Sequence, residues 1–125
     1  MSVLEPIVIH YERLNESHLA RILEIEAEAY PEPWTRGMFL DEIRNNRSYF
    51  FVAFERGELI GYAGFWLVLD EAHITTVVVK DSRRGRGVGH QMFSHLLETA
   101  REAGAVMATL EVRVSNESAK RMYAG

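Results

Sequence analysis

The chain has 125 residues, 47% of them hydrophobic, which suits a single α/β-sized core, so we expect residues 1–125 to form one domain. The 18 acidic and 14 basic residues give a formal net charge of −4, which argues against nucleic acid as a partner. The sequence has no cysteine, which excludes disulfides, cysteine metal sites and a cysteine acyl-enzyme, and favours the cytoplasm. Residues 1–10 lack the basic start of a signal peptide, and no apolar run approaches membrane-spanning length, so we expect neither secretion nor membrane insertion.

The first half of the chain predicts a strand, two helices and a hairpin. These elements are, in order, a strand at 7–11, a helix capped by Asn15, a second helix capped by Thr35, and strands at 48–54 and 59–68. Pro31 and Pro33 end the first helix, because proline cannot donate a backbone hydrogen bond inside a helix. The turn at 55–58 joins the two strands of the hairpin.

The second half of the chain predicts a βαβ unit. A third antiparallel strand at 72–79 leads through a glycine-rich turn into a helix that stops at Gly104, and a parallel strand at 105–112 follows. Asn116 then caps a helical stub at 117–123. We therefore predict an α/β (α+β) fold with a mixed, mostly antiparallel central sheet and helices on both faces.

The glycine-rich turn is the strongest local signal for a binding site. Gly85, Gly87 and Gly89 remove side chains where the backbone turns sharply, so that successive N–H groups at a helix N-terminus can converge on a phosphate. Arg83, Arg84 and Arg86 add positive charge beside this turn. The turn lacks the Lys-Ser/Thr ending that a nucleoside-triphosphate-binding loop would need. The alternative is a tight strand-to-helix turn with solvated arginines.

Three segments together resemble a known family. They are Arg84-Gly85-Arg86-Gly87-Val88-Gly89, the run from Leu110-Glu111-Val112 through Asn116 to Met122-Tyr123, and Tyr30-Pro31-Glu32-Pro33-Trp34. In their order and spacing, the chain is similar over its whole length to the GNAT superfamily of acyl-CoA N-acyltransferases. Within that superfamily it resembles the protein N-terminal acetyltransferases of the ribosomal-protein-alanine type.

The resemblance implies acetyl-CoA as co-substrate and no metal. The implied cofactor-binding residues are Val77, Val78, Val79, Arg84, Gly85, Arg86, Gly87, Val88, Gly89 and Asn116. The strand at 77–79 would bind the pantetheine amides through its backbone, which requires the neighbouring parallel strand to splay away. The implied acceptor-lining residues are Tyr30, Pro31, Glu32 and Trp34, and the implied acceptor is a protein or peptide N-terminus.

Three residues are candidates for proton transfer. Glu111 stands at the end of an apolar strand, and the resemblance makes it the base that takes the amine proton, directly or through water; the alternative is a carboxylate paired with Arg113. The resemblance makes Tyr123 the donor to the CoA sulfur, where the alternative is a tyrosine packed over its helix. It also makes His73 a secondary proton-relay candidate, with a plain strand histidine as the alternative.

The sequence departs from the family pattern after Tyr123, because the two further strands of the family do not follow. We expect a missing C-terminal hairpin, an exposed edge at strand 105–112, and dimerisation or aggregation through that edge. Two other functions stay open: acylation of a small amine or polyamine, and a module that binds CoA without turnover. Glu111 and Tyr123 argue against the second, because a module that only binds CoA needs neither a catalytic base nor a proton donor.

Overall fold

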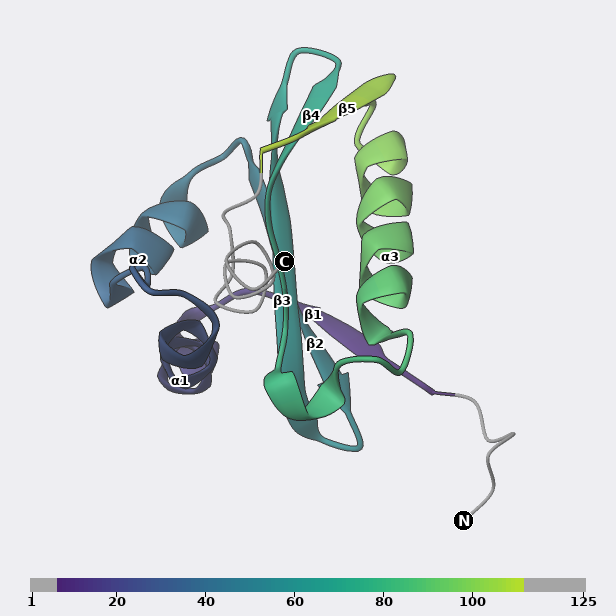
Figure 1. Cartoon of the computed structure of the whole chain (residues 1–125). Helices are drawn as coiled ribbons and strands as arrows, with labels where there is room; N and C mark the ends of the chain where they lie inside the picture. Colours follow the sequence, from purple (N-terminus) through teal and green to yellow (C-terminus); the bar gives the residue numbers. More distant parts are fainter. Residues whose placement is uncertain (1–6, 112–125) are drawn as a thin grey trace, which may run out of the picture.

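The computed structural model describes residues 7–111 and shows one sheet with helices on both faces (Figure 1). Its elements are β1 (His10–Arg13), η1 (Glu16–His18), α1 (Leu19–Ala29), α2 (Arg36–Arg44), β2 (Ser48–Glu55), β3 (Glu58–Val68), β4 (Glu71–Val79), η2 (Asp81–Arg83), α3 (Val88–Glu102) and β5 (Met107–Leu110). Helices α1 and α2 cover one face of the sheet, and α3 covers the other.

The sheet has the order β1-β2-β3-β4-β5, and only the β4–β5 pair is parallel. The predicted mixed sheet and its βαβ unit are therefore confirmed. Strand β1 begins at His10 rather than at residue 7, because its partner β2 ends one residue beyond the Phe54 that faces His10. Strand β5 begins at Met107 rather than at residue 105, because Val106 already lies opposite the turn, where its N–H donates to Asp70 at 2.8 Å.

The predicted helix starts are set by side chains that accept backbone hydrogen bonds. The Asn15 side chain accepts from the Ser17 N–H and opens the short η1 turn that precedes α1. The Thr35 side chain accepts from the Met38 N–H at the start of α2. After α3, Gly104 has φ +104°, a left-handed conformation that favours glycine and ends the helix.

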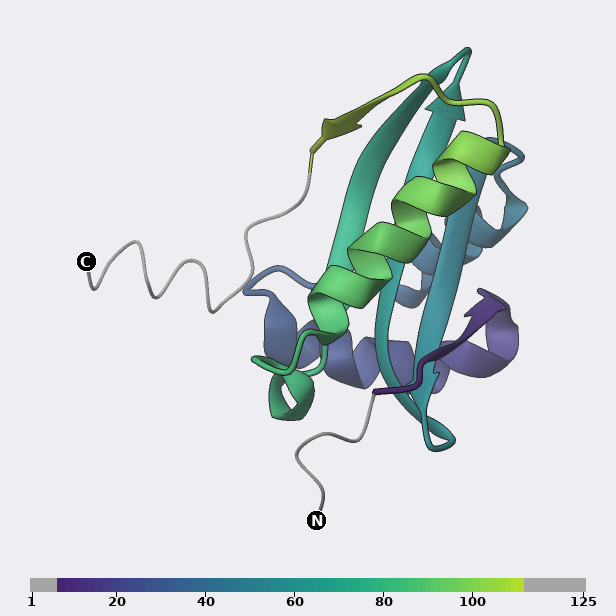
Figure 2. The ribbon, with the colours of Figure 1, turned by 90° about the vertical axis from the view of Figure 1, so that its right-hand side faces the viewer.

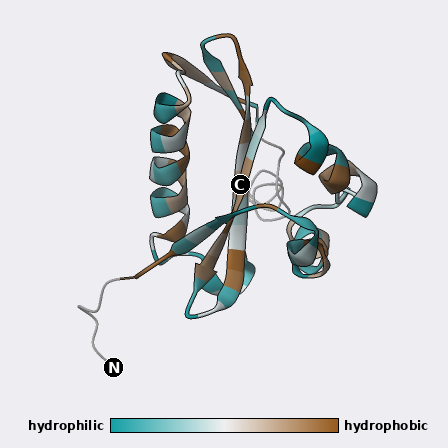
Figure 3. Ribbon diagram, turned by 180° about the vertical axis from the view of Figure 1, so that it is seen from behind, coloured by the Kyte–Doolittle hydropathy of each residue, from teal (hydrophilic) through white to brown (hydrophobic). Residues whose placement is uncertain are grey.

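Each face of the sheet carries its own hydrophobic core. Leu19, Ile22 and Phe39 pack against one face, whereas Met92 and Leu96 of α3 pack against the other. In Figure 3 the hydrophilic residues of α3 lie on the side turned away from the sheet. The helices are therefore fixed by burial on both faces, and this fixes the loops between them and the strands.

A bulge in β4 changes which side chains face α3. Gly64 pairs with Thr76 and Phe65 pairs with Ile74, so Thr75 is the extra residue. Before the bulge, Ile74 packs on the α3 side, whereas after it Val78 packs on the α1 side. The bulge therefore aims the second half of β4 differently from the first half.

Candidate active site

The glycine-rich turn forms a loop of open backbone amides at the start of α3. Gly85 has φ +77° and Gly87, the N-cap of α3, has φ +84°. Both angles are left-handed, which explains why the sequence places glycine there. Within residues 7–111, none of the N–H groups of residues 85–90 donates to a carbonyl or a side chain. These amides at a helix N-terminus can bind an anion such as a phosphate.

The arginines beside this loop are each paired with a carboxylate. Arg83 and Arg86 both contact Glu55, at 3.3 Å and 3.1 Å. Arg84 lies 3.2 Å from Asp81. The structure thus places the basic side chains at the loop, as the sequence predicted, but their guanidinium groups are engaged rather than freely solvated.

Within residues 7–111, the second half of β4 has no strand paired with its outer edge, which lies next to the loop. Strand β5 pairs with β4 as far as Ile74, which faces Leu110, the last residue of β5; Figure 2 shows β5 beside the first half of β4. The Lys80 N–H donates to the Ile60 carbonyl of β3, and peptide groups alternate along a strand. The peptide groups of Val77 and Val79 therefore point to the open side, where the Arg84 Nε donates to the Val79 carbonyl at 3.3 Å. An extended ligand chain can hydrogen-bond along this edge.

Two of the three catalytic candidates lie side by side where β5 stops pairing with β4. Glu111 Oε1 is 3.9 Å from His73 Nδ1, and the Thr109 Oγ1 is 3.3 Å from the same nitrogen. The Glu111 N–H donates to the Ile74 carbonyl at 2.8 Å, which fixes the backbone of that residue beside β4. The Glu111 side chain is 67% exposed and can be reached by a substrate. Tyr123 lies outside the described residues.

The loop between α1 and α2 holds the predicted acceptor-lining residues in different environments. Pro31 and Glu32 are exposed, Trp34 is half-buried, and Tyr30 is buried in the core on the α1 side of the sheet. Contacts of Tyr30 with an acceptor would therefore be limited to the small part of its surface that is exposed. Asn116, the remaining predicted contact of the cofactor arm, lies outside the described residues.

A fully buried carboxylate that our sequence interpretation did not single out anchors this loop. Glu26 of α1 accepts from the Trp34 N–H at 2.8 Å and from the Tyr62 hydroxyl at 2.5 Å. Glu26 falls on the apolar face of α1, four residues after Ile22, and this is the signal that could have revealed it. The contact ties the predicted acceptor loop to β3.

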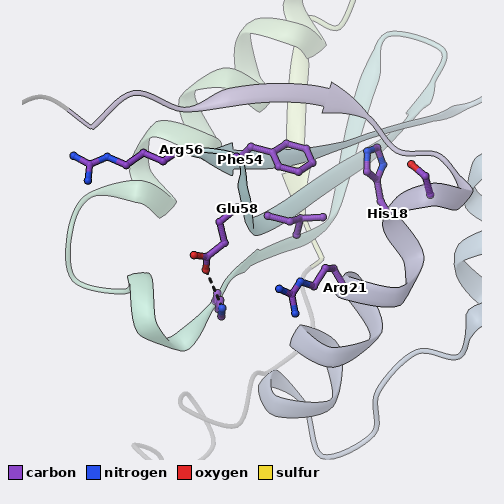
Figure 4. A pocket seen from close by; sticks show the side chains of 9 residues that line it. His18, Arg21, Phe54, Arg56 and Glu58 are labelled. Atoms are coloured by element: carbon purple, nitrogen blue, oxygen red, sulfur yellow. Dashed lines mark hydrogen bonds and ion pairs between the residues drawn. The ribbon is translucent and has the colours of Figure 1, made fainter.

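A pocket of about 480 Å³ opens between α1 and the β2–β3 hairpin, near the segment that leads into the glycine-rich turn (Figure 4). It is lined by Ser17, His18, Arg21, Phe54, Arg56, Gly57, Glu58, Leu59 and Lys80. None of the residues predicted for catalysis or cofactor binding lines it. Lys80, which directly follows β4, and its partner Glu58 connect this pocket to the segment that leads into the glycine loop.

Two other kinds of site were searched for in the described part of the chain. Residues 7–111 contain no cluster of three or more histidine, aspartate or glutamate side chains that could hold a metal ion. Within the same range, no helix is long and apolar enough to cross a membrane.

The comparisons with known proteins decide the family. The model of the acetyltransferase (GNAT) family matches residues 19–125. The chain belongs to the GNAT acetyltransferase family. This membership confirms the predicted fold and the predicted activity of an acetyl-CoA-dependent N-acetyltransferase.

This GNAT chain is similar to several named proteins. A Bacillus subtilis relative, provisionally named as a ribosomal protein bS18-alanine N-acetyltransferase, is 38% identical over 103 residues, which are 82% of this chain and 68% of the relative. The crystal structure of the Escherichia coli ribosomal-protein-S18-alanine N-acetyltransferase matches 94% of this chain and 75% of its own, with a TM-score of 0.76 and 26% identity. The crystal structure of a Thermoplasma acidophilum N-acetyltransferase in complex with coenzyme A matches 94% of this chain and 87% of its own, with a TM-score of 0.73 and 17% identity, a likeness that shows the shared fold.

Proposed function

We propose that this GNAT enzyme transfers the acetyl group of acetyl-CoA to the N-terminal α-amine of a protein, with an alanine-initiated ribosomal protein as the acceptor class. The observation that carries the proposal is the position of Glu111 and His73. They lie together where β5 leaves β4, next to the open edge of β4. The names of the Bacillus subtilis and Escherichia coli relatives support the acceptor class.

The cofactor would lie along β4 with its pyrophosphate at the glycine loop. The open amides of residues 85–90 would bind the pyrophosphate, and the outward peptide groups of Val77 and Val79 would bind the pantetheine amides. Val78 turns its peptide groups to β3, so its part in the site would be to hold its two neighbours in register. This arrangement would bring the thioester towards the end of β5, where Glu111 lies.

The reaction proposed here is a direct attack in a ternary complex. The neutral amine attacks the thioester carbonyl, a carbon–nitrogen bond forms, and the carbon–sulfur bond breaks as the thiolate leaves. Glu111 would accept the proton of the amine, directly or through water, with His73 beside it as a proton relay. Tyr123, on the basis of the resemblance, would return a proton to the CoA sulfur.

An α-amine suits a base of this kind. Its reference pKa is about 7.7 to 8.0, against about 10.4 for a lysine side chain, so a larger fraction is neutral at physiological pH. Trp34, held in place by Glu26, and the exposed Pro31 and Glu32 would form the acceptor wall. A cytoplasmic location, and dimerisation through the edge strand, stay predictions from the sequence.

The proposal is tested by mass spectrometry of acetylation with four acceptors. These are an alanine-initiated peptide, the same peptide with a formylated N-terminus, an N-terminally blocked lysine peptide, and spermidine. We expect acetylation of the first alone. Equal or faster acetylation of spermidine would replace a protein acceptor with a small amine.

A further inference from the structure

Two carboxylates of the β2–β3 hairpin hold three basic side chains of the segment between β4 and α3. Glu58 lies 2.9 Å from Lys80 Nζ and 2.9 Å from Arg83 Nη2. Glu55 lies 3.3 Å from Arg83 Nε and accepts two hydrogen bonds from Arg86, at 3.2 Å and 3.1 Å. The five side chains form an alternating series of charges, which we call the charge chain, and Figure 4 shows its member Glu58 beside the pocket.

Burial makes Glu55 the central member of the charge chain. Its side chain is only 9% exposed, against 35% for Glu58 and 44% for Arg86. A carboxylate this buried requires charged partners, and two guanidinium groups supply them. The Nε of Arg83 is buried and makes no hydrogen bond within residues 7–111, so the nearby Glu55 charge is its main compensation. Removing Glu55 would therefore take both carboxylate contacts from Arg86 and, in the described part of the chain, would leave Arg83 held by Glu58 alone.

The outer part of the charge chain is held electrostatically as well. The hydrogen bond from Lys80, together with the positive charges of Arg83 and Lys80, keeps the pKa of Glu58 below its ordinary value. Glu58 thus stays charged and continues to hold Arg83 from the other side. The β2–β3 hairpin therefore holds the segment between β4 and α3 by ion pairs at both ends of η2, to Lys80 before it and to Arg83 at its last residue.

We propose that Glu55 is a positioning residue for the cofactor loop, acting through Arg83 and Arg86. The guanidinium groups of Arg83 and Arg86 form ion pairs with Glu55, and the pyrophosphate binds to the backbone amides of residues 85–90. Because the loop is fixed before the cofactor arrives, less conformational entropy is lost on binding. The inference rests on the proposed function, which places CoA at this loop.

The test is a double-mutant cycle in the whole chain, with CoA affinity measured by calorimetry. We expect Glu55→Gln and Arg86→Gln each to weaken CoA binding by about fivefold to twentyfold, and the double variant to be no weaker than Glu55→Gln alone, since coupled partners are non-additive. The KM for acetyl-CoA should rise by the same factor, and the KM for the acceptor peptide should stay unchanged. The control is Glu24→Gln, which breaks an exposed ion pair with Arg21 on α1.

Each outcome decides the matter. Tighter binding by Glu55→Gln would show that the arginines bind the phosphate and that Glu55 competes for them, and this would overturn the proposal. Additive losses in the double variant would show that Glu55 and Arg86 act independently, and this would overturn it as well. If Glu55→Gln does not fold, Glu58→Gln tests the same ion-pair network through the more exposed carboxylate that also holds Arg83. The proposal would be overturned if both Glu58→Gln and Arg86→Gln bound CoA as tightly as the parent. A parent protein that binds no CoA would overturn the proposed function as well.

Discussion

Gly87 offers the sharpest test of how the loop binds its ligand. Its φ of +84° is left-handed, yet a Cβ added there would meet no atom within 4 Å. The penalty for Gly87→Ala is therefore conformational, about 1–2 kcal/mol for an L-residue in the left-handed region. If the variant loop relaxes when free and must return to this shape with CoA, affinity should fall roughly fivefold to thirtyfold, since about 1.4 kcal/mol is tenfold. Gly87→Val, with its branched side chain, should lose more.

Gly89 supplies a matched control two residues away. It lies in the first turn of α3 with no positive φ, and a Cβ there would make an ordinary contact 3.5 Å from Val79 Cγ2. Gly89→Ala should therefore keep CoA affinity within about twofold while favouring the helix by roughly 0.5–1 kcal/mol. Calorimetric titration with CoA compares the two variants directly. Equal affinities for Gly87→Ala and Gly89→Ala would refute the requirement for a left-handed residue.

Three further predictions concern catalysis, pH and packing. Glu111→Gln should lower turnover by about 10²-fold or more with CoA affinity intact, as expected for loss of a general base, and unchanged turnover would move that role to another group or to solvent. Burial lowers the pKa of His95 below its ordinary 6.5. As the pH falls below 6.5, this histidine is therefore protonated in the unfolded chain before it is protonated in the folded one, and the free energy of unfolding should decrease. Urea unfolding of the parent and of His95→Phe at about pH 7.5 and about pH 5.5 measures this, and the variant should lose that part of the pH dependence. Gly61→Ala should destabilise by about 1–3 kcal/mol, because its Cβ would lie 2.5 Å from the Val78 carbonyl oxygen; an unchanged urea midpoint would contradict that packing.

The elements that the sequence predicted correctly are those set by local chemistry. Asn15 and Thr35 cap their helices through hydrogen bonds to residues two or three positions away. Gly104 ends α3 through its own backbone angle. The start of β1 was placed too early, because it depends on where β2 ends, which is a property of the pairing and not of the β1 residues.

The long-range contacts of the site could not be read from the sequence. His73 and Glu111 are far apart in the chain, and the parallel register that sets His73 opposite Thr109 brings them together. Glu55 gave no signal of its role, because its partners lie on another element. The place of Glu26 on the apolar face of α1 signals burial, but its partners Trp34 and Tyr62 lie on other elements. The resemblance named the candidates for catalysis, whereas the ion pairs that fix the cofactor loop emerged only from the fold.

The central claim is that the acceptor is an α-amine, and one peptide tests it most directly. An alanine-initiated peptide with an internal lysine is incubated with acetyl-CoA and the enzyme, and tandem mass spectrometry locates the acetyl group. Both amines then share one chain and one concentration. We predict acetylation of the N-terminal amine, lost in Glu111→Gln. Acetylation of the lysine in preference to the N-terminus would contradict the account.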